Sequence, residues 1–132
     1  MFFTRREIGR VYVIRMTLPC GTKVLKVGMT NSNRATDRVF EILRSWFNSF
    51  RYVPHTSLRL DHECYDPAKV ETFIHKVLGR YAYDPGMKVQ GYTEMFVGIN
   101  ELKLLHFIKN TEMVPEGLSG ADYRILGKLL VG

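Results

Sequence analysis

Two polar residues interrupt apolar, strand-like runs of the chain. Lys26 lies within the apolar run of residues 24–29, where burying an unpaired ammonium would be costly. It faces either solvent on an edge strand or a cleft in which it meets an anion. Tyr12 lies in the run of residues 9–16, where a core tyrosine with a satisfied hydroxyl is the commoner outcome. If the two runs form a hairpin closing around Pro19, Tyr12 lies opposite Lys26 on the same face.

Glu71 and His75 form an E-x-x-x-H pair. On a helix these side chains are neighbours one turn apart. Such pairs are usually solvated, but this one borders an apolar stripe, so its groups could point into a crevice. One carboxylate with oxygen or water ligands suits Mg²⁺ or Mn²⁺. It does not suit a structural zinc, for which the sequence has no cluster of cysteine and histidine residues.

Arg38 is the candidate phosphate ligand. A surface salt bridge is the ordinary fate of such an arginine, but its guanidinium fork also matches phosphate oxygens. Arg34 competes for this role, and Lys23 and Arg44 are further candidates for contacts with nucleic acid. The 19 lysines and arginines outnumber the 13 acidic residues, for a net charge of +6, which is compatible with a polyanionic partner. The basic residues are dispersed, so folding must assemble any basic surface.

The strand-like segments predict a small antiparallel sheet that positions these residues. Residues 9–16 and 23–29 flank a turn rich in proline and glycine, which is typical of a β-hairpin. Residues 56–62 alternate weakly and could form a third strand, and residues 93–99 form a short extended segment. Because the hairpin leads the chain and helices follow, we expect an α+β fold with a sheet of about three strands flanked by helices.

Four helices are expected around this sheet. The first runs from about residue 34 to about residue 49, and the second begins at Pro67 and carries an apolar stripe as far as Tyr81. Asn100 caps a third helix over residues 101–109, and residues 125–131 form the last. The apolar face of the first helix is expected to contain Val39, Leu43, Trp46, Phe47 and Phe50.

Length and hydropathy bound the class of protein. The 132 residues fit one domain, with a core at about 9–99 and a C-terminal helical extension at 100–132. No apolar run approaches the ~20 residues that a membrane span requires, and the first residues do not resemble a signal peptide. We therefore expect a soluble, cytoplasmic protein that does not enter membranes. Residues 114–132 either complete the core or form the contact of a homodimer.

The order of these motifs resembles the GIY-YIG nuclease superfamily. The closest likeness is to its short phage-type branch, in which K-[IV]-G replaces Y-I-G as the second motif. The resemblance spans residue 9 to about residue 99. The segments that carry it are Gly9-x-Val11-Tyr12-Val13-Ile14, Leu25-Lys26-Val27-Gly28-Met29-Thr30, Arg38, Glu71-x-x-x-His75 and Gly91-x-Thr93-Glu94-Met95-Phe96.

The resemblance implies a metal-dependent endonuclease that hydrolyses phosphodiester bonds, with DNA as the expected substrate and Mg²⁺ or Mn²⁺ as cofactor. Tyr12 matches the tyrosine that activates the attacking water, and Lys26 stands where many members have a second tyrosine. Arg38 matches the arginine that holds the scissile phosphate. Glu71 matches the metal-binding glutamate, and His75 a frequent companion residue. The branch also implies a phage-encoded protein that acts inside a host cell.

Some alternatives stay open from the sequence. The segment between Gly28 and Arg38 is two residues longer than is usual in the family, so Arg34 competes with Arg38 as the phosphate clamp. The late asparagine of the family has Asn100 as its only nearby candidate. The alternative function is a catalytically silent module on the same scaffold that binds nucleic acid or another partner.

Overall fold

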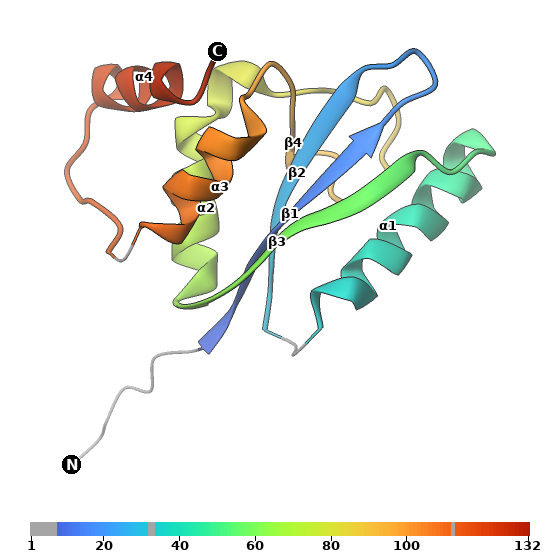
Figure 1. Cartoon of the computed structure of the whole chain (residues 1–132), viewed down its shortest axis with the longest axis horizontal. Coiled ribbons are helices and arrows are strands. Elements are labelled where there is room, and N and C mark those ends of the chain that lie inside the picture. The colour runs from blue at the N-terminus through green and yellow to red at the C-terminus, as the bar shows by residue number, and fades with distance from the viewer. Residues whose placement is uncertain (1–7, 32–33, 112) are drawn as a thin grey trace.

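The computed structural model describes residues 8–31, 34–111 and 113–132. Four strands and four α-helices are interleaved along the chain (Figure 1). In order they are β1 (Ile8–Thr17), β2 (Lys23–Thr30), α1 (Ala35–Phe50), β3 (His55–Tyr65), α2 (Pro67–Val77), a 3₁₀ turn (Gly79–Tyr81), β4 (Met95–Phe96), α3 (Glu101–Lys109) and α4 (Gly120–Leu129).

The sheet is antiparallel throughout, with the strand order β3-β1-β2-β4. The α+β class and the leading hairpin are thus confirmed. The expectation of about three strands was wrong by one, because Met95 and Phe96 pair with Lys26 and Leu25 as a fourth strand. This strand is only two residues long. The backbone turns away at Gly98, whose φ of 76° suits glycine.

The third strand is longer than the sequence indicated, because β3 extends the expected 56–62 segment at both ends. Most of its side chains are partly or fully exposed, so the alternation that marks a half-buried strand is faint. A bulge interrupts its pairing with β1, where Leu58 pairs with Ile14 and Leu60 with Val13, leaving Arg59 as the extra residue.

Each face of the sheet has its own apolar core. Tyr12, Ile14 and Met16 of β1 lie in the core that includes Trp46 of α1. Val11 and Val13, on the other face of β1, belong to the core shared with α2 and α3. In Figure 1, α1 accordingly lies on one side of the sheet and α2, α3 and α4 lie on the other. Tyr12 and Lys26 therefore belong to the α1 side, and Glu71 belongs to a helix of the opposite layer.

The predicted core face of α1 is confirmed for Trp46, Val39 and Phe50, which lie in or against the core on this side of the sheet, but it was wrong for Phe47. Ala35, Ile42 and Trp46 are its buried residues, whereas Phe47 is 48% exposed and Phe40 is 65% exposed. The helix carries apolar residues on two sides, so apolar spacing does not determine which side meets the sheet.

The remaining helices differ from the predictions mainly at their ends. Helix α2 stops at Val77, ahead of Gly79 and the 3₁₀ turn, and does not continue to Tyr81. Helix α3 has the expected bounds, with Asn100 accepting a hydrogen bond from the Lys103 N–H. Helix α4 begins earlier than expected, because Ser119 and Asp122 form a capping box. Within the described residues, no helix is long and apolar enough to cross a bilayer.

Candidate functional site

The register of the β1–β2 hairpin places Tyr12 and Lys26 on the same face of the sheet. Their predicted direct opposition was wrong, because Tyr12 pairs with Gly28 and Lys26 with Ile14. The turn that sets this register runs from Leu18 to Thr22, where two backbone hydrogen bonds close it. Lys26 lies two residues from Gly28, the direct partner of Tyr12. Because side chains alternate between the faces of a sheet, this offset keeps Lys26 and Tyr12 on the same face as diagonal neighbours.

Gly28 provides the space in which these groups meet. A Cβ atom there would collide with the phenol of Tyr12 and lie 2.7 Å from Lys26 Nζ. Gly91 serves Lys26 in the same way from the other side, because a Cβ atom at that position would collide with the lysine side chain. The two glycines therefore let a buried tyrosine and a buried lysine approach each other.

Lys26 is 2% exposed and donates hydrogen bonds to two oxygens. Its Nζ lies 2.9 Å from Tyr12 Oη and 2.7 Å from Glu94 Oε2. Glu94 reaches Lys26 from the segment that leads into β4. Because β2 is flanked by β1 and β4 at this position, Lys26 is not a solvent-facing residue of an edge strand. Its ammonium is held by a carboxylate and a phenol.

Helix α2 covers the edge of β2 where the short strand β4 leaves it open. His75 Nε2 lies 2.7 Å from the Val27 carbonyl oxygen, and Glu71 accepts a backbone hydrogen bond from Met29. A carbonyl only accepts, so Nε2 carries the proton in this contact. Glu71 and His75 therefore both contact the backbone of β2 from the same helix, and His75 does so at the Val27 carbonyl.

The carboxyl group of Glu71 is partly shielded from water. Burial raises its pKa to about 7, and the negative charge of Glu94 adds to the increase. The positive charges of Lys26 and Arg38 and the hydrogen bond from Met29 lower it, but by less. The group therefore lies in a region where additional positive charge would be stabilising.

Residues of α1 and of the segment before β4 hold the side chain of Arg38. Its Nη1 donates to Glu41 Oε2 at 3.0 Å, and Gln90 Nε2 donates to the same oxygen at 2.8 Å. Gln90 is itself anchored, because its backbone N–H donates to Ser45 Oγ. Arg34 instead occupies the N-cap of α1, 3.8 Å from Asp37, with its side chain 69% exposed.

These groups open into one pocket of about 210 Å³. That volume holds roughly seven water molecules at liquid density. Arg38 lines the pocket, whereas Arg34 and His75 are not among its described lining residues. The lining consists of Tyr12, Lys26, Met29, Arg38, Glu71, Gln90, Gly91 and Glu94.

Glu71 is the residue of this pocket that could ligate a hydrated magnesium or manganese ion. Glu71 is a half-buried carboxylate with a raised pKa, and the volume accommodates several waters. Mg²⁺ typically binds one or two carboxylates, retains several waters and takes further oxygens from phosphate groups. No group of three or more histidine, cysteine or acidic residues able to hold a metal is found in the described part of the chain, so an ion bound by Glu71 would take most of its ligands from water and phosphate oxygens.

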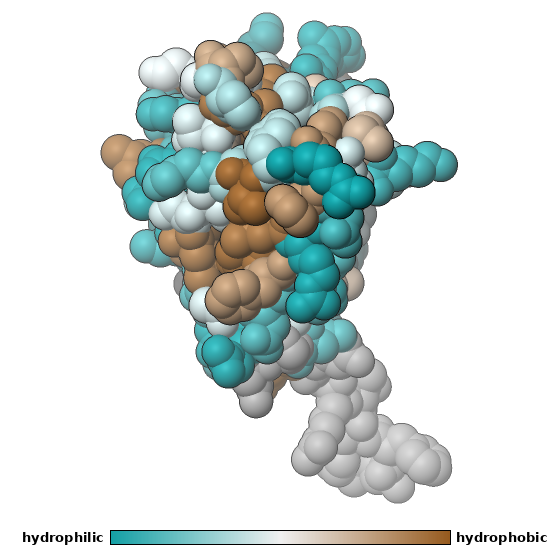
Figure 2. Space-filling view, turned by 90° about the vertical axis from the view of Figure 1, so that its right-hand side faces the viewer, coloured by the Kyte–Doolittle hydropathy of each residue, from teal (hydrophilic) through white to brown (hydrophobic). Residues whose placement is uncertain are grey.

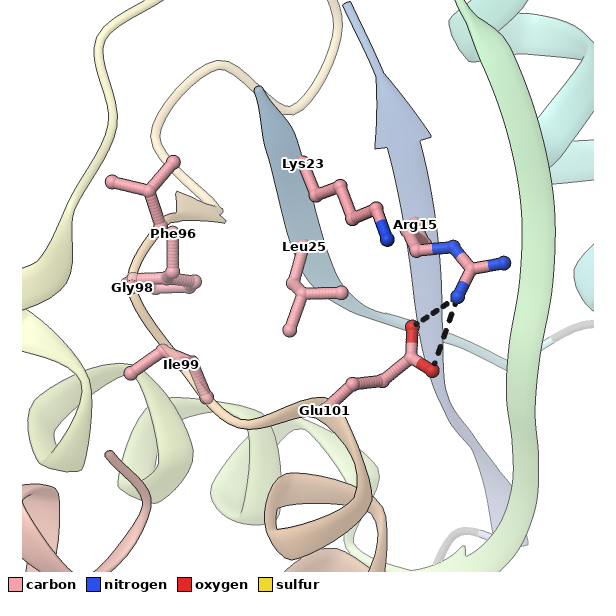
Figure 3. A pocket seen from close by; sticks show the side chains of 8 residues that line it. Arg15, Lys23, Leu25, Phe96, Gly98, Ile99 and Glu101 are labelled. Carbon is pink, nitrogen blue, oxygen red and sulfur yellow. Dashed lines mark hydrogen bonds and ion pairs between the residues drawn. The ribbon is translucent and has the colours of Figure 1, made fainter. Parts of the chain in front are cut away.

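Three other candidates lie away from this pocket. Lys23 lines a pocket on the opposite face of the sheet, shown in Figure 3, where Arg15 donates to Glu101. Arg44 is an exposed residue of α1. Asn100 caps α3 and does not line the pocket of Tyr12 and Glu71.

Sequence reasoning missed three residues that shape the site. Glu94 was read only as part of a motif, although it binds Lys26 directly. Glu41 and Gln90 position Arg38. The signal for Glu94 was its place just ahead of an extended segment, but nothing in the sequence indicated that this segment pairs beside Lys26.

No family model matches the chain, and no curated protein or solved structure matches it either.

Proposed function

We propose that this chain is a metal-dependent endonuclease of the GIY-YIG type that hydrolyses phosphodiester bonds, with DNA as its expected substrate. One observation carries the proposal: Tyr12, Lys26, Arg38 and Glu71 come from four different elements and line one pocket. A phenol, two cations and a half-buried carboxylate are the groups that such a hydrolysis uses. The net charge of +6 supports a polyanionic substrate.

Arg38 is the residue proposed to bind the scissile phosphate. Glu41 occupies Nη1 of its guanidinium, which leaves other N–H groups to donate to phosphate oxygens. Because Glu41 and Gln90 hold the side chain at the rim, little conformational freedom is lost when a phosphate binds. The planar fork also makes a lysine a poor substitute at this position.

Tyr12 is proposed to accept a proton from the attacking water. Its Oη already accepts a hydrogen bond from Lys26, and that ammonium can stabilise negative charge on the phenolate oxygen. The phenol first releases its own proton to solvent. As the water oxygen then bonds to phosphorus, the proton of the water passes to the phenolate, the bond from phosphorus to the 3′ oxygen breaks, and the 3′ oxygen takes a proton from solvent. The products are a 5′ phosphate and a 3′ hydroxyl. Glu94 holds Lys26 in place for this step.

Glu71 would hold the divalent cation at the pocket. When bound, such an ion supplies Lewis-acid stabilisation of charge on the departing oxygen. Without it, Glu71 and Glu94 repel each other, which contributes to the raised pKa of Glu71. His75 is proposed to act as a positioning residue, because it holds the edge of β2 through Val27.

Plasmid cleavage tests the proposal. Incubation of the purified protein with supercoiled plasmid and Mg²⁺ or Mn²⁺ is expected to give nicked or linear DNA, and excess EDTA is expected to abolish it. Glu71→Gln should remove the activity, whereas Glu63→Gln, at an exposed position of β3, should retain it. Activity that survives EDTA or Glu71→Gln would sink the mechanism. Salt-dependent binding without cleavage under either metal would favour the catalytically silent module.

A further inference from the structure

Helix α1 carries an apolar stripe on the side that faces away from the sheet. Phe40 is 65% exposed and Phe47 is 48% exposed. Arg44 follows Phe40 by four residues and precedes Phe47 by three, so these three residues share one side of the helix, and Arg51 is the exposed C-cap residue that follows at its end. Figure 2 shows this side of the molecule, with brown side chains gathered in the middle and dark teal side chains along their edge. We call these four residues the outer stripe.

The arginines of the outer stripe differ from the other two arginines of α1 and its N-cap. Arg34 lies 3.8 Å from Asp37, and Arg38 lies 3.0 Å from Glu41. Arg44 and Arg51, in contrast, form no salt bridge within the described part of the chain. The outer stripe therefore combines two exposed aromatic rings with two cations that form no salt bridge in the described residues, although the charge of Arg44 contributes to lowering the pKa of the neighbouring Glu41.

These charges argue against a second copy of the chain as the occupant. In a symmetric pair of α1 helices, the same patch meets itself. Residues 43 and 44 lie midway between Phe40 and Phe47, so stacking the phenylalanines across the pair brings the two copies of Arg44 together. Like charges at an interface are unfavourable. A partner that offers both planar rings and negative charge avoids this conflict.

We propose that the outer stripe binds an unpaired segment of nucleic acid, with bases stacked on Phe40 and Phe47 and phosphates bound by Arg44 and Arg51. Aromatic side chains with interleaved cations are the usual platform for single strands. The bases of an intact duplex are already stacked on one another, so their faces are not free for these rings. The two rings lie about 10 Å apart along the helix axis, so each takes a separate base.

This inference extends the proposed function by naming the kind of substrate that the same protein holds. Helix α1 also presents Arg38 to the pocket, so one rigid element connects the outer stripe to the proposed phosphate site. A substrate with a single-stranded segment beside the cleaved bond would use both.

Fluorescence anisotropy with a labelled 20-nucleotide oligothymidylate tests the inference. The measurements are made in EDTA on the Glu71→Gln chain, so that cleavage does not interfere. Phe40→Ala and Phe47→Ala are each expected to weaken binding roughly fivefold or more, the lower end for one stacked base. Phe40→Trp should retain binding, and Ile125→Ala, at a position on α4 that is 60% exposed, should change it by less than about twofold. Arg44→Gln should reduce the slope of log affinity against log salt by about 0.7.

Wild-type affinity in both phenylalanine variants overturns the inference, and so does a dimer in sedimentation that Phe40→Ala dissociates, because the occupant is then a second copy. A failure of the proposed nuclease function gives a different result from a failure of this inference. If the full chain never cleaves nucleic acid but loses oligothymidylate binding through Phe40→Ala and Phe47→Ala, the inference stands and the nuclease proposal does not.

Discussion

Lys26 Nζ lies 2.9 Å from Tyr12 Oη although the two residues are not paired across the hairpin. The contact is diagonal and depends on Gly28, which faces Tyr12 directly. Glu94 completes the arrangement by binding the same ammonium at 2.7 Å. A buried lysine with two oxygen partners at the wall of a pocket is the feature on which the nuclease proposal depends.

Gly28→Ala should destabilise the fold by about 1–3 kcal/mol, the usual cost of overpacking a well-filled core. The added methyl group would collide with the Tyr12 phenol and crowd Lys26 Nζ. Urea denaturation monitored by circular dichroism gives the free energy of unfolding. Gly79→Ala is the matched control, because a Cβ atom at that position meets nothing within 4 Å. Equal stabilities of the two variants would refute the packing account.

Glu94→Gln should reduce kcat about tenfold while KM changes little. Glutamine retains an oxygen acceptor for Lys26 but removes the carboxylate charge, so the ion pair is lost and only the hydrogen bond from the ammonium remains. Lys26 would then be held less firmly beside Tyr12. Steady-state cleavage kinetics separate the two parameters. A rise in KM at constant kcat would instead assign Glu94 to substrate binding.

Metal affinity should depend on pH through Glu71, whose carboxyl pKa is raised to about 7. Below that pH, protonation competes with the metal, so Mn²⁺ binding should weaken about tenfold per pH unit and level off above it. Titration calorimetry with Mn²⁺ alone, without nucleic acid, measures this dependence. Glu71→Gln should bind no Mn²⁺ at this pocket, and a pH-independent affinity in the wild type would rule out Glu71 as the ligand.

Stability without metal should also respond to Glu71. Its carboxyl pKa is about 7 in the fold and 4.5 as the reference for an exposed group, so the folded state binds more protons between these values. The free energy of unfolding should therefore fall as the pH rises from about 4.5 to 7. Urea denaturation across this range, compared with Glu71→Gln, isolates the contribution. If both proteins show the same pH slope, the raised pKa does not contribute to stability.

His75→Ala should destabilise the protein by about 1–3 kcal/mol, because the Val27 carbonyl loses its hydrogen-bond donor at the β2 edge. His55→Ala, at the exposed start of β3, is the control and should have little effect. Thermal unfolding measures the difference. A positioning role also predicts that the remaining activity of His75→Ala retains the wild-type pH profile, whereas loss of one limb would identify His75 as an acid or base.

Much of the fold follows from local sequence signals. The turn between residues 18 and 22, the proline that starts α2 and the asparagine that caps α3 are short-range features, and they predicted the hairpin and these two helix starts correctly. The outward face of Phe47 and the pairing of β4 depend on contacts between distant segments. No local pattern contains that information.

In the site, too, local signals identified single residues but not their partners from distant segments. The sequence identified Lys26 as out of place because a lysine within an apolar strand requires a partner. It did not identify Glu94 as that partner, which lies 68 positions further along the chain. It also left Arg34 as a competitor of Arg38 for the phosphate, and the position of the pocket relative to α1 separates them.

The most direct test of the central claim is the single-turnover rate of DNA cleavage by Tyr12→Phe. This substitution keeps the ring that packs over Gly28 and removes only the oxygen that Lys26 contacts. We predict a rate at least about 100-fold below that of the wild type, the lower range for loss of a general base, with unchanged DNA affinity in EDTA. Cleavage by Tyr12→Phe at the wild-type rate would contradict the account.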